Sequence, residues 1–236
     1  QAMVFVREFK EDEFLLFCTR KGTVKKTRLS EYSNVRTVGI KAIKIEEGDE
    51  LIEVAVTSGN NDVVIATRHG LSIRFHESDA REMGRDTTGV KGIELGDDDQ
   101  VVGMVVIKRE ATLLCFTEKG LGKCTHIDEY RVQKRGGKGI LTVNRTEKTG
   151  DVVALMEVLP EDEIMIITKA GMIIRSPVSQ VRVAGRATQG VKLVNLDGND
   201  VVTAVARVIP EDDKEVEGGS GDEPGPETPE LALEEQ

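Results

Sequence analysis

The chain has 236 residues, a formal net charge of −10 at pH 7 and only 3% aromatic residues. It is long enough to bury a sizeable core, and it contains no apolar stretch long enough for a membrane-spanning helix and no signal-peptide pattern. Residues 209–236 hold 11 acidic side chains against one Lys, whereas residues 1–208 hold 31 acidic and 31 basic ones. We therefore expect a cytoplasmic protein with a neutral body, 1–209, and a disordered acidic tail, 210–236.

A unit of about fifty residues occurs four times. Each copy has an apolar run, a Thr-x-x-Gly step and a second glycine further on. The first glycines are 48, 50 and 51 residues apart, and the second glycines are 50, 50 and 51 apart: Gly22, Gly70, Gly120 and Gly171, then Gly39, Gly89, Gly139 and Gly190. This period is typical of propeller blades or another repeat array.

The segments inside each unit are short and rich in Val, Ile, Leu and Thr, which favours strands. The Thr-x-x-Gly steps predict hairpin turns where the backbone takes a positive φ. Only residues 77–83 could form a helical turn. We expect an all-β, propeller-like fold with about four strands per blade, the blades covering residues 1–56, 57–107, 108–158 and 159–209.

A glycine-rich basic stretch stands out in the third unit. It places three cations and three glycines within seven positions: Gln133, Lys134, Arg135, Gly136, Gly137, Lys138 and Gly139. Glycine is costly to fix in a helix or strand, so we expect an exposed loop on which cations approach a phosphate backbone. The alternative is a surface loop that is basic without a DNA role.

The other units carry cations at corresponding places. Arginines occur shortly before the second glycine of a unit: Arg36, Arg85 and Arg186. Further cations follow the first glycine: Lys25, Lys26, Arg74, Lys123 and Arg175. Lys91 follows the second glycine of its unit. Around a ring these side chains would form a basic band that binds duplex DNA through phosphates without reading sequence. The scarcity of aromatic side chains disfavours single-strand binding by base stacking.

No catalytic or metal site is predicted. The three histidines are scattered, the run at 97–99 is an acidic turn, and residues 185–190 lack the lysine of a phosphate loop. Tyr32 and Tyr130 occupy equivalent repeat positions, which indicates a structural role, and Cys18 and Cys115 lie in apolar runs typical of core thiols. We expect no cofactor in this chain.

The basic stretch 133–139 resembles the "gyrase box" of the C-terminal domain of the bacterial DNA gyrase A subunit, with Lys134 in place of an arginine. Segments 22–27, 87–93 and 185–191 are also similar to that domain, and the resemblance covers residues 1–209. It implies a β-pinwheel, usually of six blades, whose basic perimeter wraps DNA with a defined hand. In gyrase this supports ATP-driven negative supercoiling.

The resemblance also implies partners. These are duplex DNA, the N-terminal cleavage domain of gyrase A and the gyrase B subunit in a heterotetramer, with ATP and Mg²⁺ bound elsewhere in the assembly. The chain would then be part of a type II topoisomerase, associated with the nucleoid, without catalytic residues of its own.

Two departures from the family pattern lead to a further expectation. Four units are visible, and the box lies in the third, whereas in the family it usually lies in the first of six. The four units resemble the last four blades, so we expect the sequence to begin inside a longer polypeptide. Two alternatives stay open: the C-terminal domain of the topoisomerase IV cleavage subunit, and a propeller that binds protein partners. The tail serves either solubility or competition with DNA for the basic surface.

Overall fold

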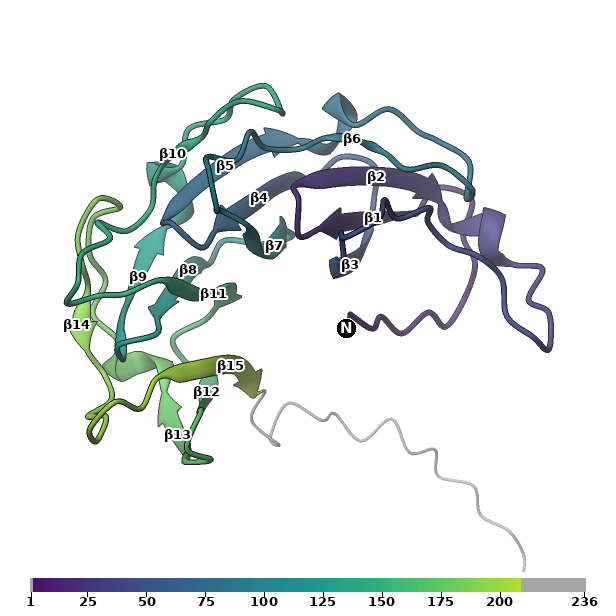
Figure 1. The fold of residues 1–236 in the computed structure, drawn as a ribbon. Coiled ribbons are helices and arrows are strands. Elements are labelled where there is room, and N and C mark those ends of the chain that lie inside the picture. The colour runs from purple at the N-terminus through teal and green to yellow at the C-terminus, as the bar shows by residue number, and fades with distance from the viewer. Residues whose placement is uncertain (1, 209–236) are drawn as a thin grey trace, which may run out of the picture.

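The computed structural model describes residues 2–208, and four small antiparallel sheets follow one another around an open arc (Figure 1). The predicted acidic tail, 210–236, lies outside the described residues. None of the helices within 2–208 has the length and apolar character needed to cross a bilayer.

The described part of the chain contains fifteen strands and four short 3-10 turns. The strands are β1 (Phe14–Thr19), β2 (Thr23–Arg28), β3 (Leu51–Thr57), β4 (Asp62–Thr67), β5 (Leu71–His76), β6 (Val90–Lys91), β7 (Val101–Ile107), β8 (Thr112–Thr117), β9 (Leu121–His126), β10 (Ile140–Leu141), β11 (Val152–Val158), β12 (Glu163–Thr168), β13 (Ile173–Pro177), β14 (Val191–Lys192) and β15 (Val202–Val208). The 3-10 turns are η1 (Leu29–Tyr32), η2 (Glu77–Asp79), η3 (Ile127–Glu129) and η4 (Val178–Gln180). The all-β, propeller-like prediction is confirmed, and the possible helical turn at 77–83 is only the short η2.

Each repeat forms most of one blade. The sheets have the orders β3-β1-β2-β6, β10-β5-β4-β7, β11-β8-β9-β14 and β13-β12-β15. The last strands of the four repeats, β3, β7, β11 and β15, lie on the inner side of the arc, and neighbouring ones contact each other (Figure 1). The Thr-x-x-Gly turns close the hairpins before β2, β5, β9 and β13, and their glycines have φ between +79° and +90°, as predicted.

The outermost strand of a sheet comes from the next repeat. Two-residue strand β6 pairs with β2, β10 with β5, and β14 with β9 (Figure 1). The segment that follows the second glycine therefore completes the preceding blade. Within residues 2–208, the fourth sheet has three strands, and its β13 edge carries the exposed Ile173.

The core lies between neighbouring sheets. Alternate residues of β4 face opposite ways: Val63 and Ile65 join a cluster with the first blade, whereas Val64 and Ala66 join one with the third. A strand that is buried on both faces reads as a continuous apolar run, with side chains alternating between two cores. This explains why the sequence shows four-residue apolar runs rather than polar alternation.

The cysteine thiols are buried in this core, as predicted for Cys18 and Cys115, and Cys124 is buried as well. Burial raises the pKa of all three thiols, that of Cys115 to about 12. We therefore expect Ellman's reagent at pH 8 to modify them at least about 100-fold more slowly in the folded protein than in denaturant. Rapid modification of any of the three in the native protein would contradict this packing.

Candidate nucleic-acid interface

The basic loop 133–139 crosses the outer edge of the second blade. The Gln133 amide donates to the Arg74 carbonyl oxygen at 2.7 Å at the start of the loop, and β10 begins directly after Gly139. Gly139 has φ +77°, and a Cβ there would collide with the Ser72 carbonyl oxygen. The loop therefore needs glycine at this position both for backbone conformation and for close contact with β5.

The same loop, which we call the box loop, also contacts the outer strand of the first blade. The Gly136 amide donates to the Gly92 carbonyl oxygen at 2.6 Å, and the Glu94 amide donates to the Gly137 carbonyl oxygen at 2.9 Å. The Arg135 guanidinium donates to the carbonyl oxygens of Asp79, at 2.7 Å, and Lys91, at 2.8 Å. The box loop thus joins two consecutive blades along the perimeter.

The cations of this loop have two different environments. Arg135 is half-buried and bonded to backbone carbonyls, whereas Lys134 and Lys138 are exposed. Neither lysine forms an ion pair with any residue in 2–208, and the exposed Lys91 lies beside Gly136. Lys134, Lys138 and Lys91 therefore present free ammonium groups next to a rigid backbone, which suits phosphate binding.

Arg186 is the counterpart of Arg135 in the next repeat, since each lies four positions before its second glycine. Its guanidinium donates to the carbonyl oxygens of Glu129, at 3.2 Å, and Leu141. Arg85 occupies the same repeat position and is half-buried. Arg36 is exposed but lies only three positions before Gly39, so it is not equivalent to them.

The predicted DNA contacts of Lys25 and Lys123 are wrong. Both side chains are 0% exposed, and their ammonium groups donate to backbone carbonyl oxygens. The acceptors are Ala42 and Arg85 for Lys25, and Gly185 and Arg186 for Lys123. An ammonium group sealed from solvent has no contact with a phosphate on the surface. Their spacing after the first glycine therefore marks an internal contact.

The remaining strand cations are paired with carboxylates. Lys26 is buried and lies 3.6 Å from Glu77 (Nζ to Oε2), which makes its predicted DNA contact wrong as well. Arg74 lies 2.7 Å from Asp62 (Nη2 to Oδ2) and also donates to two carbonyl oxygens, so its guanidinium is committed internally. Arg175 is exposed and paired with Glu163 across the β12–β13 hairpin, and its DNA contact stays a prediction.

A second basic site was missed in the sequence. Lys119, Lys148 and Lys192, all exposed, surround a hollow of about 320 Å³ at the outer edge of the third blade. Lys192 stands two residues after Gly190, as Lys91 stands two residues after Gly89. That repeat equivalence was a signal for Lys192, whereas Lys119 and Lys148 come together only through the fold.

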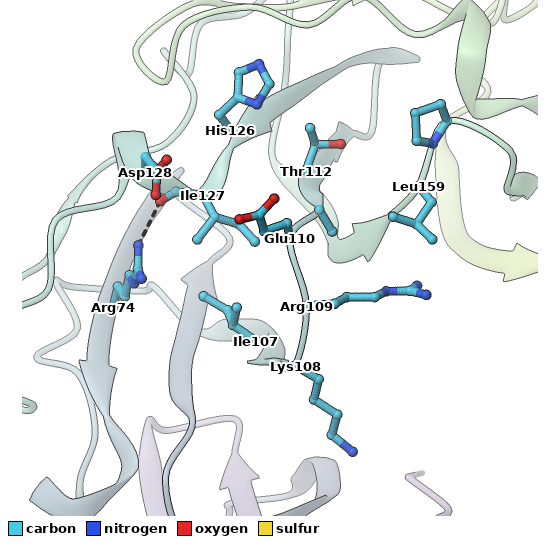
Figure 2. A pocket seen from close by; sticks show the side chains of 12 residues that line it. Arg74, Ile107, Lys108, Arg109, Glu110, Thr112, His126, Ile127, Asp128 and Leu159 are labelled. Atoms are coloured by element: carbon cyan, nitrogen blue, oxygen red, sulfur yellow. Dashed lines mark hydrogen bonds between the residues drawn. The ribbon is translucent and has the colours of Figure 1, made fainter.

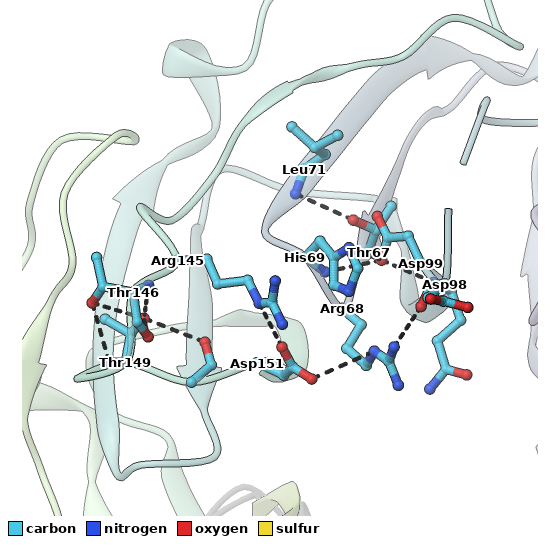
Figure 3. A network of polar contacts seen from close by, with 12 residues as sticks. Thr67, Arg68, His69, Leu71, Asp98, Asp99, Arg145, Thr146, Thr149 and Asp151 are labelled. Atoms are coloured by element: carbon cyan, nitrogen blue, oxygen red, sulfur yellow. Dashed lines mark hydrogen bonds and ion pairs between the residues drawn. The ribbon is translucent and has the colours of Figure 1, made fainter. Parts of the chain in front are cut away.

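Ion pairs between the second and third blades stiffen the arc. Asp151 lies 3.5 Å from Arg68 (Oδ2 to Nε) and 2.6 Å from Arg145 (Oδ1 to Nε), which joins the turn of the second blade to the third (Figure 3). The Val152 amide donates to the Arg68 carbonyl oxygen at 2.8 Å beside this network. This contact recurs as Val101 to Arg20 and Val202 to Glu118, so each blade is attached to the next in the same way.

An open pocket of about 600 Å³ lies between the second and third blades (Figure 2). It mixes charges of both signs: Arg109 is paired with Glu157 at 2.6 Å (Nε to Oε1), and Arg74 is held by Asp62 and by the Ile127 carbonyl oxygen. Among residues 2–208, no group of three His, Cys, Asp or Glu side chains is placed to hold a metal ion. Tyr32 and Tyr130 are buried, so neither hydroxyl is available as a surface nucleophile.

Four linked sheets around an arc, with exposed lysines on loops at the outer edge, define a propeller-like repeat protein. A family model described as the DNA gyrase C-terminal domain, beta-propeller, matches residues 13–58, 61–108, 111–158 and 162–209. The chain belongs to this family.

Curated relatives give the same result. The chain is 43% identical over 217 residues to the DNA gyrase A subunit of Clostridium acetobutylicum, covering 92% of this chain and 26% of the relative. It is 44% identical over 218 residues to the DNA gyrase A subunit of Staphylococcus aureus strain MRSA252, covering 91% and 25%. The chain therefore spans about a quarter of the length of these relatives.

Solved structures resemble the arc. The C-terminal domain of DNA topoisomerase IV superposes with a TM-score of 0.81 at 25% identity, over 86% of this chain and 64% of that chain. The DNA gyrase A C-terminal domain superposes with a TM-score of 0.78 at 25% identity, over 88% and 70%.

Proposed function

We propose that this chain binds duplex DNA through its phosphates along the outer perimeter and wraps it with a defined hand. The observation that carries the proposal is the box loop, 133–139: it is hydrogen-bonded to two blades and holds Lys134 and Lys138 free at the surface. Smooth bending of a 20–30 bp DNA segment costs on the order of 1–6 kcal/mol, so a wrapping surface has to be rigid and rich in phosphate contacts. The lysine hollow on the third blade extends the same perimeter.

The proposed setting is the gyrase holoenzyme. There the chain would act with the cleavage domain of gyrase A and with gyrase B, which would supply the nucleophilic tyrosine, Mg²⁺ and ATP hydrolysis for negative supercoiling. A cytoplasmic, nucleoid-associated location follows from that role. The identity of 43–44% with gyrase A subunits and the intact basic stretch 133–139 support this setting over topoisomerase IV.

A DNA topology assay tests the proposal. The purified chain is incubated with relaxed circular DNA and a nicking-closing enzyme, and the linking-number change is read at about 50 and 200 mM salt. We expect a positive shift that fades at the higher salt, because each phosphate contact releases counterions. Binding without a shift would contradict chiral wrapping by these blades, and absence of binding at both salts would favour a propeller that binds protein partners.

A further inference from the structure

One strand position alternates between two residue types around the arc. Three residues after the first glycine, the four repeats carry Lys25, Ile73, Lys123 and Ile174. The first three side chains are fully buried, at 0% exposed, beneath the perimeter loop contributed by the next repeat. The inner side of that loop therefore contacts an ammonium group where the residue is Lys and an apolar side chain where it is Ile.

The lysines hold their loops through carbonyl oxygens. Lys123 Nζ donates to the carbonyl oxygens of Gly185, at 2.7 Å, and Arg186. Lys25 Nζ donates in the same way to Arg85, the repeat counterpart of Arg186, and to Ala42 at 2.8 Å. Burial lowers the pKa of both lysines to about 8, so both amines are still mostly protonated at neutral pH. A charged donor gives stronger hydrogen bonds to these carbonyls than a neutral one would.

The loops themselves differ in step with this position. Loops 84–89 and 185–190, which cover the lysines, each contain a Thr whose hydroxyl donates to the glycine carbonyl oxygen three residues earlier, at 2.8 Å. The box loop, which covers Ile73, has Gly137 at that place, and a Cβ there would make an ordinary van der Waals contact with the Ile73 Cδ1 atom, at 3.8 Å. The buried Ile73 thus lies under a loop with two adjacent glycines, whereas the buried Lys25 and Lys123 each lie under a loop with a Thr turn.

We propose that this strand position selects the perimeter loop that docks on each blade. Lys25 and Lys123 act as positioning residues that order loops 84–89 and 185–190, while Ile73 matches the glycine pair of the box loop. Loop order is a property of the protein alone, and its effect on wrapping rests on the proposed function. In this way the buried side chains at this strand position, which do not contact DNA themselves, set the position and orientation of the loop cations proposed to bind it.

The substitution Lys123→Ile tests the proposal with a residue that the second and fourth repeats already use. The amides of Ala184 and Thr188, bonded to the carbonyl oxygens of Cys124 and Gly185, report on the loop. We expect them to exchange hydrogen for deuterium about ten-fold faster in the variant, because two charge-assisted hydrogen bonds are lost. The control Lys169→Ile removes an exposed charge in the turn of the fourth-blade hairpin, outside the proposed DNA-binding residues, and should leave these amides unchanged.

A compensating variant separates loop selection from simple damage. Adding Ala187→Gly and Thr188→Gly to Lys123→Ile gives loop 185–190 two adjacent glycines, as in the box loop, above a buried isoleucine. We expect the Ala184 amide to regain most of its protection in this triple variant. In the topology assay, we expect Lys123→Ile to lose the linking-number shift and the triple variant to regain it. Thr188→Gly alone, with Lys123 retained, should loosen the loop rather than tighten it.

Two outcomes would overturn the proposal. One is unchanged exchange at Ala184 and Thr188 in Lys123→Ile, or in Lys123→Met if the isoleucine variant does not fold by circular dichroism. The other is a triple variant no better protected than Lys123→Ile. If the wild-type chain gives no linking-number shift, the wrapping function fails, but the exchange measurement still decides the role of Lys123.

Discussion

Replacing Gly139 with Ala is expected to lower the free energy of unfolding by about 3 kcal/mol, because the new Cβ meets two obstacles at once. The backbone there has φ +77°, which L residues rarely adopt, and the methyl group would collide with the Ser72 carbonyl in β5. The strand that follows, β10, would have to leave the edge of the second blade. Urea denaturation followed by circular dichroism measures the change.

The first repeat provides a matched control for this substitution. Gly39 occupies the equivalent position with φ +79°, but a Cβ added there would have no atom within 4 Å. Gly39→Ala should therefore carry only the conformational cost, about 1 kcal/mol. Equal losses in the two variants would show that the close approach of the box loop to β5 contributes nothing to stability.

Neutralising the exposed lysines of the box, Lys134→Gln with Lys138→Gln, is expected to abolish wrapping while leaving weaker binding. Each lost phosphate contact reduces the slope of log K against log salt by about 0.9, so the pair should reduce it by about 2. The linking-number shift should disappear, because the DNA path depends on contacts at this crossing between blades. Fluorescence anisotropy across a salt series and the topology assay measure the two effects separately.

Arg135 should behave differently from the two lysines. Its guanidinium is engaged with the carbonyl oxygens of Asp79 and Lys91, so Arg135→Gln should loosen the box loop and lower stability as well as wrapping. Lys108→Gln, which removes an exposed charge outside the predicted set, is the control for charge alone. If wrapping and binding fall equally when Lys134, Arg135 and Lys138 are all neutralised, the box has no special role in wrapping.

The repeat and its turns could be predicted from the sequence, since they depend on local chemistry. The glycines after Thr-x-x are required by positive φ, and the apolar runs of β1, β4, β8 and β12 follow from burial between sheets. The box loop could also be located, because adjacent glycines are costly to fix in a strand and therefore indicate an exposed loop.

The strand lysines could not be assigned correctly from spacing. Lys25 and Lys123 stand on strands like surface cations, but they face a loop that comes from about sixty residues further along the chain. One signal was available: Ile73 and Ile174 occupy the same repeat position, and an apolar residue there indicates a buried site. Arg74 was misread for the related reason that its partner Asp62 lies on the neighbouring strand, β4.

The exchange of outer strands between repeats has a consequence for synthesis on the ribosome. Val24 in β2 pairs with Val90 in β6, so the first sheet is completed only after 66 further residues have been synthesised. At about 5–20 residues per second, the edge of each new sheet stays open for roughly 3–13 s. An unpaired edge is a template for wrong pairing with a neighbouring nascent chain. Translation speed, and not only thermodynamic stability, should therefore influence the yield of correctly paired blades.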